Sequence, residues 1–360
     1  MTVVKADEQA PSLPVAPYRA LALQVRCDAV NRSTDPSAAQ ARMADSIARL
    51  DRQIAASKAF IGSDCRLVVL PEYFLTGFPL GESLPVWTAK AALDPDGPQE
   101  RSLGAIAAAH GVYLSGNVYE RDPAFPGLYV QASLIWAPSG AVVLRYRRLH
   151  SLFAPTPHDL WDRYLQTYGV DSLFPVVRTE LGNLACVASE EILIPELSRV
   201  LAMRGAEVLL HSTSEVGSPR QTPKDVGRLA RSMENLCFII SANSAGIADV
   251  DIPLASTDGK SQIVDHNGRV LAEAGSGESM VANAEIDVDA LRRARRRPGM
   301  GNLLARNRFE LWADQYARFA TEGLGHEPGN ISSEQVPDRS HFARTHAAVI
   351  ERLQRAGVIA

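Results

Sequence analysis

The strongest constraint on the fold is the alternation of short apolar segments with segments of helical periodicity, which runs through both halves of the chain. In the first half, strand-like segments at 18–27 and 65–74 flank residues 37–57, whose apolar side chains recur with helical spacing. The second half repeats this order in segments 184–205, 206–215, 226–236 and 237–247. Such alternation predicts an α/β protein in which helices pack in layers against sheets.

Two predicted hairpins interrupt this alternation. Residues 128–150 contain two strand-like segments around a turn at 138–140, and residues 259–275 turn at the Asn-Gly pair 267–268, the dipeptide most typical of tight hairpins. Hairpins add antiparallel neighbours, so we expect sheets of mixed strand direction. Several strand-like segments end in polar residues, and we expect those ends to meet at one edge, where ligand sites tend to form.

The composition favours a soluble globular protein without a nucleic-acid or membrane partner. Hydrophobic residues make up 46% and charged residues 22% of the 360 residues, and the net charge is −4. These values give no reason to expect binding to nucleic acid or to an anionic membrane. No apolar run reaches the ~18 residues that a membrane span needs, and residues 1–17 lack the features of a signal peptide.

The cysteines and the motifs argue against metal, disulfide and cofactor chemistry. Cys27, Cys65, Cys186 and Cys237 stand in neither CxxC pairs nor zinc-binding spacing. Reduced, buried thiols are the natural interpretation, so we expect a cytoplasmic location. The sequence contains no dinucleotide fingerprint and no P-loop. We therefore expect no metal and no cofactor.

Two places in the first half have residues suited to chemistry. Glu72 directly follows an apolar strand-like segment, and a carboxylate removed from water at a strand end is a stronger base. A helix cap or a structural ion pair is the alternative for Glu72. Arg148 shares a strand face with Tyr146, and an inward guanidinium can hold a carboxylate or stabilise an oxyanion. An exposed basic edge strand is the alternative for Arg148.

The third place is the stretch LACVASEEILIPELSR at 184–199, a strand followed by a turn and a helix. Strand parity places Cys186 in mid-strand, as a small buried hydrophobic residue. It places Ser189 at the end of the strand, where a side chain can face a pocket. A turn or cap serine is the alternative for Ser189. We expect Glu191 to pair with an arginine, for example Arg199.

These stretches, in this order, resemble the motifs of the nitrilase, or carbon–nitrogen hydrolase, superfamily. LPEYFLTGFP resembles its glutamate motif, YRRLHS its lysine motif and the stretch that begins LACVASEE its cysteine motif, and the resemblance covers 18–312, with further matches at 231–243 and 259–271. The resemblance implies a four-layer αββα sandwich that pairs into larger assemblies. It also implies a Glu-Lys-Cys triad that hydrolyses amides, carbamoyl groups or nitriles through a thioester.

The candidate triad departs from that pattern at two of its three positions. Glu72 is retained, but Arg148 stands where the resemblance places the lysine and Ser189 where it places the cysteine. A serine must lose its proton to a base as it attacks, and an arginine stays protonated near neutral pH. A positive charge beside Glu72 also weakens it as a base. An engineered exchange of cysteine for serine would account for Ser189 but not for Arg148.

Two hypotheses follow for the function. In the first, the chain hydrolyses a small amide, N-carbamoyl or nitrile compound: Ser189 attacks, Glu72 takes its proton and Arg148 stabilises the oxyanion. In the second, the chain is a catalytically silent relative that binds a small carboxylate or amide. Under either hypothesis we expect the ligand to contact further residues at the strand ends, namely Tyr73, Asn117, Glu190, His211 and Thr213.

We expect three regions along the chain: a flexible leader at 1–17, the carbon–nitrogen hydrolase-like αββα domain at 18–290, and a C-terminal extension at 291–360. The extension is predicted to be mostly helical and polar. Apolar residues among basic ones in 298–319 suit a subunit contact, as does the helical segment 344–357. Together with the resemblance, this pattern predicts a homodimer or a higher homo-oligomer that binds a small molecule.

Overall fold

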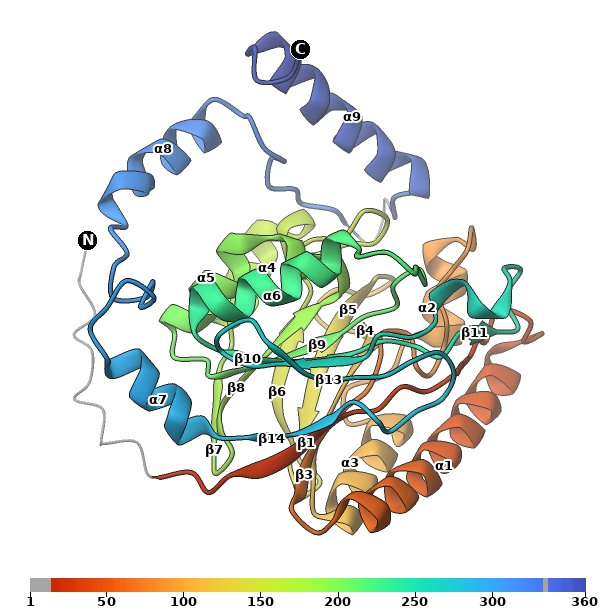
Figure 1. Ribbon diagram of the computed structural model, residues 1–360. Coiled ribbons are helices and arrows are strands. Elements are labelled where there is room, and N and C mark those ends of the chain that lie inside the picture. The colour runs from red at the N-terminus through yellow and green to blue at the C-terminus, as the bar shows by residue number, and fades with distance from the viewer. Residues whose placement is uncertain (1–13, 333–335) are drawn as a thin grey trace.

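The computed structural model describes residues 14–332 and 336–360. Most of the predicted leader, residues 1–13, lies outside the described residues. The described residues form two six-stranded sheets that lie face to face, with helices on both outer faces (Figure 1). This arrangement confirms the predicted α/β fold class, an αββα sandwich.

Each sheet combines parallel strands at its centre with antiparallel strands at its edges. The first sheet has the order β14 (Asn283–Ile286), β1 (Tyr18–Ala22), β3 (Cys65–Val69), β4 (Tyr113–Arg121), β5 (Tyr129–Trp136) and β6 (Val142–Arg147). The second has the order β13 (Val270–Glu273), β12 (Gln262–Val264), β10 (Phe238–Ala242), β9 (Val208–Ser212), β8 (Gly182–Ala188) and β7 (Val177–Thr179). The strands β1, β3 and β4 are parallel, as are β8, β9 and β10. A separate pair joins β2 (Cys27–Asp28) to β11 (Ile247–Ala248).

Helices cover the outer face of each sheet (Figure 1). The first sheet carries α1 (Pro36–Ile61), α2 (Leu84–Ala91) and α3 (Pro98–His110), and the second carries α5 (Pro195–Met203) and α6 (Pro223–Asn235). The short helix α4 (Trp161–Tyr168) lies in the connection after β6. The apolar stripe of α1 is buried against its sheet, as its helical spacing predicts.

The main core lies between the two sheets. Leu67 and Val69 of β3 point into this core, and Val68 points toward the helices on the other face. Because both faces of the central strands are covered, these strands are continuous apolar runs in the sequence. Both predicted hairpins are confirmed, since β5 pairs with β6 and β12 pairs with β13 in antiparallel register.

One helix begins earlier than the sequence predicted. Helix α6 starts at Pro223 and not at residue 226. Thr222 is its N-cap: the Thr222 hydroxyl accepts from the N–H of Asp225 (3.2 Å), and the Asp225 carboxylate accepts from the N–H of Thr222 (2.9 Å). This capping box places Lys224 in the first helical turn.

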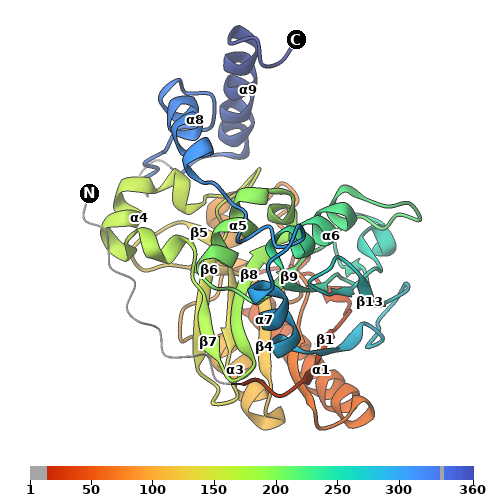
Figure 2. The same ribbon diagram turned by 60° about the vertical axis from the view of Figure 1, so that its left-hand side comes forward.

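The C-terminal extension leaves the sandwich in two stages. Helix α7 (Val288–Arg296) still packs on it, with Val288 and Leu291 buried in the main core, so the body of the fold continues past residue 290. Helices α8 (Glu310–Thr321) and α9 (Arg339–Arg355) project beyond the sandwich (Figures 1 and 2), although Phe342 at the start of α9 packs into the core between the first sheet and its helices. Within the described ranges, no helix combines the length and the apolarity needed to cross a membrane.

Candidate active site

The predicted site residues gather where the parallel strands of the two sheets end. The Ser212 hydroxyl at the end of β9 donates to the carbonyl of Leu70 after β3 (2.8 Å), and the N–H of Glu72 donates to the carbonyl of Thr213 (3.2 Å). These hydrogen bonds join the carboxyl ends of the two sheets. Because β8 runs parallel to β9 and Ala188 pairs with Ser212, Ser189, which follows β8, lies at the same edge.

Glu72 is buried at this edge, and its carboxylate is surrounded by donors. The residue is 1% exposed. Its Oε1 accepts from Nη1 of Arg148 (3.0 Å) and from Nε2 of Gln131 (3.1 Å). Gln131 lies on β5. It was not predicted as a site residue, because the sequence of an apolar strand does not show which polar side chain in it will face the site. The contact between Glu72 and Arg148 agrees with the positive charge beside Glu72 that the resemblance implies.

Arg148 is buried and each of its three guanidinium nitrogens has a partner, so the alternative of an exposed basic edge strand is wrong. It follows β6 directly and is 4% exposed. Besides Glu72, its guanidinium contacts the side-chain carbonyl of Gln131, the carboxylate of Glu190 and the backbone carbonyl of His150 (2.7 Å). Burial on its own lowers the pKa of Arg148, but the carboxylates of Glu72 and Glu190 raise it above its ordinary value. The guanidinium therefore stays charged near neutral pH.

Ser189 directly follows β8, as the first residue of a 3-10 turn (Ser189–Leu193), in a backbone conformation that few residues other than glycine adopt. Its φ is 50°, in the left-handed region, and the residue is 4% exposed. Strained turns of this kind recur at functional sites, where they direct a side chain out of the strand. Tyr73, the residue after Glu72, has a φ of 60°. The two positive-φ residues thus lie on the two loops that frame the site.

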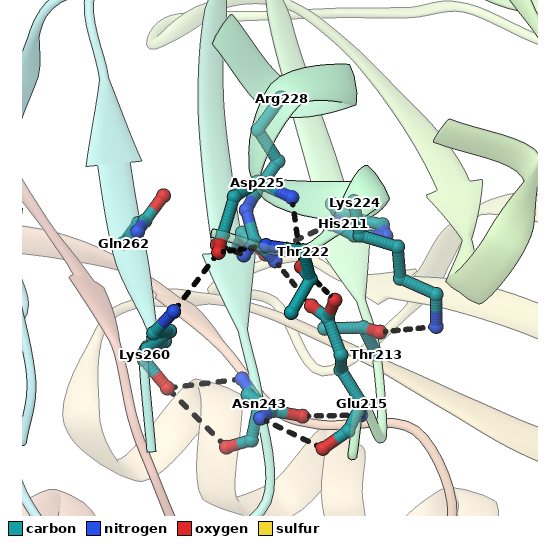
Figure 3. Close-up of polar contacts among 12 residues, drawn as sticks. His211, Thr213, Glu215, Thr222, Lys224, Asp225, Arg228, Asn243, Lys260 and Gln262 are labelled. Carbon is teal, nitrogen blue, oxygen red and sulfur yellow. Dashed lines mark hydrogen bonds and ion pairs between the residues drawn. The ribbon is translucent and has the colours of Figure 1, made fainter. Parts of the chain in front are cut away.

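Lys224, which contacts the Ser189 hydroxyl, was not predicted from the sequence. Nζ of Lys224, in the first turn of α6, lies 3.1 Å from Oγ of Ser189. It also lies 3.1 Å from Oγ1 of Thr213 (Figure 3). Desolvation lowers the pKa of Lys224 below its usual value, and neighbouring carboxylates offset only part of that effect. The available signal was Thr-Pro-Lys-Asp at 222–225, an N-cap followed by proline and an acid at the third position.

Glu191 joins the turn after β8 to the segment after β6. Its fully buried carboxylate accepts from the Tyr146 hydroxyl (2.7 Å) and from the backbone N–H groups of Leu149 and His150 (2.8 and 3.0 Å). The expected pairing with Arg199 is wrong, because these donors occupy the carboxylate instead. Glu191 therefore fixes the segment that carries Arg148 next to the turn that carries Ser189.

Asn117 and His211 are buried and hydrogen-bonded to other residues of the site. Asn117 accepts from Nε2 of Gln131 (3.3 Å), the amide that also contacts Glu72. One ring nitrogen of His211 lies 2.9 Å from the Ser189 carbonyl, and the other lies 2.8 Å from a serine hydroxyl on β10. Burial lowers the pKa of His211 well below its usual value, so the ring is neutral at neutral pH. Asn117 is thus linked through Gln131 to Glu72, and His211 is linked to the backbone of Ser189.

Cys186 belongs to the core between the sheets, as strand parity predicts. It is fully buried in the middle of β8, and its Sγ lies 3.8 Å from the Ser115 hydroxyl. Burial raises the pKa of the Cys186 thiol to about 12, so little reactive thiolate is present at neutral pH. The described residues hold no group of three or more His, Cys, Asp or Glu side chains placed to bind a metal ion.

Comparison with known proteins identifies the class to which this fold and site belong. The model of the carbon–nitrogen hydrolase family matches residues 24–296. The chain therefore belongs to the carbon–nitrogen hydrolase family. The match confirms the resemblance that the sequence motifs carried.

Relatives and solved structures agree with this assignment. The 2-oxoglutaramate amidase of Bacillus subtilis is 32% identical over 62% of this chain and 78% of its own. An (R)-stereoselective amidase of a Pseudomonas species is 29% identical over 71% of this chain and 85% of its own. A carbon–nitrogen hydrolase from Helicobacter pylori superposes with a TM-score of 0.60 at 19% identity, over 83% of this chain and 98% of that one. An amidase from a Nesterenkonia species gives 0.57 at 19% identity, over 83% and 96%. At these identities, the structural likeness supports the fold alone.

Proposed function

We propose that the chain hydrolyses a small amide, N-carbamoyl or nitrile compound, with Ser189 as the attacking group. The observation that carries the proposal is the position of Ser189, which is buried in a positive-φ turn at the end of β8. At that edge it is one residue away from Glu190, which contacts Arg148. Family membership supports the reaction class, because amidases are among the relatives.

Arg148 and the backbone N–H of Glu190 are suited to stabilise the oxyanion. Arg148 is permanently charged and held in place by Glu72, so it need not reorganise when negative charge develops. The N–H of Glu190 directly follows the attacking residue in the turn. The Glu190 side chain is 41% exposed while that of Arg148 is 4% exposed, so a substrate would approach from the side of Glu190.

For an amide, the reaction has two steps, the acylation of Ser189 and the hydrolysis of the resulting ester. Oγ of Ser189 forms a bond to the carbonyl carbon, the carbon–nitrogen bond breaks, and the amine leaves with the proton that the serine lost. Water then attacks the serine ester, the acid leaves, and the serine regains its proton. The sum is one amide and one water converted to one acid and one amine.

The test is whether the chain turns over a panel of short amides, N-carbamoyl amino acids and nitriles. Ammonia release measures turnover, and the intact mass of the protein detects an acyl adduct. Ser189→Ala and Glu72→Gln are each expected to lower turnover by about 10²-fold or more, through loss of the nucleophile and of the charge that holds Arg148. Cys186→Ala serves as the matched control, because its thiol lies in the core, and it is expected to keep activity.

Two results would overturn the proposal. The first is an adduct on Cys186 or activity retained in Ser189→Ala. The second is ligand-dependent thermal stabilisation without turnover of any compound, which would favour a catalytically silent protein that binds a small carboxylate or amide.

A further inference from the structure

We infer that Lys224 is the group that accepts the proton of Ser189, so that the chain carries a serine–lysine pair built from β8 and α6. The inference rests on the proposed function for its amide substrate, but activation of Ser189 can be measured without that substrate. Glu72 then anchors Arg148 and is not the base for the attack.

The contacts of the Lys224 amine suit a group that takes a proton. Its Nζ lies 3.1 Å from Oγ of Ser189, within the reach required of a general base. Among the described residues, its other hydrogen-bond partner is the hydroxyl of Thr213, also at 3.1 Å. Both partners are neutral hydroxyls, which leave the amine free to exist in either protonation state. Glu72, by contrast, already accepts hydrogen bonds from Arg148 and Gln131.

The charges around Lys224 differ from those around Arg148. The charged and titratable groups that face the amine come from four elements: Glu72 after β3, Arg148 after β6, Glu190 after β8, and His211 and Glu215 at the end of β9. Desolvation lowers the pKa of Lys224, Arg148 adds to that effect, and the three carboxylates oppose it without cancelling it. A neutral amine is therefore more accessible at Lys224 than at an exposed lysine.

A frame of hydrogen bonds and ion pairs surrounds the start of α6 (Figure 3). Asp225, the capping-box acid, accepts from Nζ of Lys260 (3.0 Å) and from the guanidinium of Arg228. Glu215 accepts from the Thr222 hydroxyl and from Arg228 (3.3 Å). The frame fixes the backbone of Lys224, so the amine reaches Ser189 with only its own side-chain torsions to order.

The proton moves in a balanced cycle. As Oγ of Ser189 bonds to the carbonyl carbon, its proton passes to the neutral Nζ of Lys224 and the carbonyl electron pair moves to oxygen. The resulting ammonium gives that proton to the leaving nitrogen as the carbon–nitrogen bond breaks. In the second half, Lys224 takes a proton from the attacking water and returns it to Oγ of Ser189.

The test uses a fluorophosphonate, which reacts with an activated serine by forming an oxygen–phosphorus bond and releasing fluoride. We expect the full-length chain to be labelled on Ser189, located by peptide mass. Lys224→Met is expected to slow labelling by about 10²-fold or more, and Lys224→Arg, which stays protonated, is expected not to restore it. Lys58→Met is the matched control, because Lys58 lies in the last turn of α1, just before β3 begins, whereas the site lies where β3 ends.

The pH dependence of labelling in the unchanged chain provides a second measurement that does not depend on how a variant folds. The labelling rate should rise with pH as Lys224 loses its proton, with a midpoint below the ~10.4 of an ordinary lysine. A rate independent of pH, an unlabelled Ser189, or Lys224→Met labelled at the normal rate would each overturn the inference. Labelling that depends on Lys224 without turnover of any amide would instead overturn the proposed function and leave the pair standing.

Discussion

At the scale of single residues, the site contains two basic residues, Arg148 and Lys224, whose surroundings differ. Arg148 is held by the carboxylates of Glu72 and Glu190 and keeps a constant charge. Lys224 touches only the hydroxyls of Ser189 and Thr213 among its hydrogen-bond partners in the described residues. A guanidinium suits a place where charge must stay constant, and an amine suits one where a proton must move.

The cost of keeping Lys224 partly buried should appear as a pH dependence of stability. Its pKa is lower in the folded chain than in the unfolded chain, so the unfolded chain binds more protons between these two values. The free energy of unfolding therefore rises with pH through that window, and the destabilising effect of Lys224 is complete below the folded pKa.

Lys224→Met removes this effect. We expect its stability, relative to the unchanged chain, to be greater at pH ~7 than at pH ~10.4, where an unfolded lysine is half-deprotonated. Urea denaturation across this range measures the difference. Parallel curves for the two chains would contradict the lowered pKa.

At the scale of the element, the start of α6 decides where the lysine lies. Thr222 caps the helix, and its hydroxyl also contacts Glu215. Thr222→Ala is expected to cost about 1 kcal/mol of stability. It should also lower turnover, because the first turn that carries Lys224 loses its cap. Thr222→Ser keeps the hydroxyl and should restore both. Full turnover in Thr222→Ala, measured at a temperature where the chain stays folded, would show that the cap does not position the amine.

The elements also show which parts of the site could be predicted from the sequence. Strand parity separated Cys186 from Ser189 because a period of two holds along a regular strand. The partners of Glu191 could not be predicted, because two of them are backbone N–H groups after β6 that carry no signal in the sequence. Lys224 was not predicted as a site residue, although the sequence carried a signal for it. The helix was predicted from residue 226 by its periodicity, and the capping residues before that position were overlooked.

At the scale of the whole molecule, helices α8 and α9 lie outside the sandwich (Figures 1 and 2). Helix α8 has no buried residue, and its aromatic side chains Trp312, Tyr316 and Phe319 are exposed in the single chain. Exposed aromatic residues on one helix are typical of a contact with another molecule. Homo-oligomeric assembly and a cytoplasmic location stay predictions.

If α8 forms the subunit contact, Trp312→Glu together with Phe319→Glu should reduce the molar mass in solution to that of a single chain. Light scattering after size exclusion measures this mass. The thermal midpoint of the single chain should change little, because neither side chain packs in a core. An unchanged oligomer would place the contact elsewhere, and a monomer before substitution would rule out assembly through α8.

The capped start of α6 has an electrostatic consequence for the proposed pair. The N-terminal end of a helix carries the positive pole of its macrodipole, worth about half an elementary charge. Lys224 lies within the first turn, so an ammonium there is repelled by the helix that holds it. The repulsion makes the ammonium of the proposed pair a stronger acid, which favours transfer of its proton to the leaving nitrogen. The helix that brings the amine to the serine thus also weakens the hold of the amine on the proton.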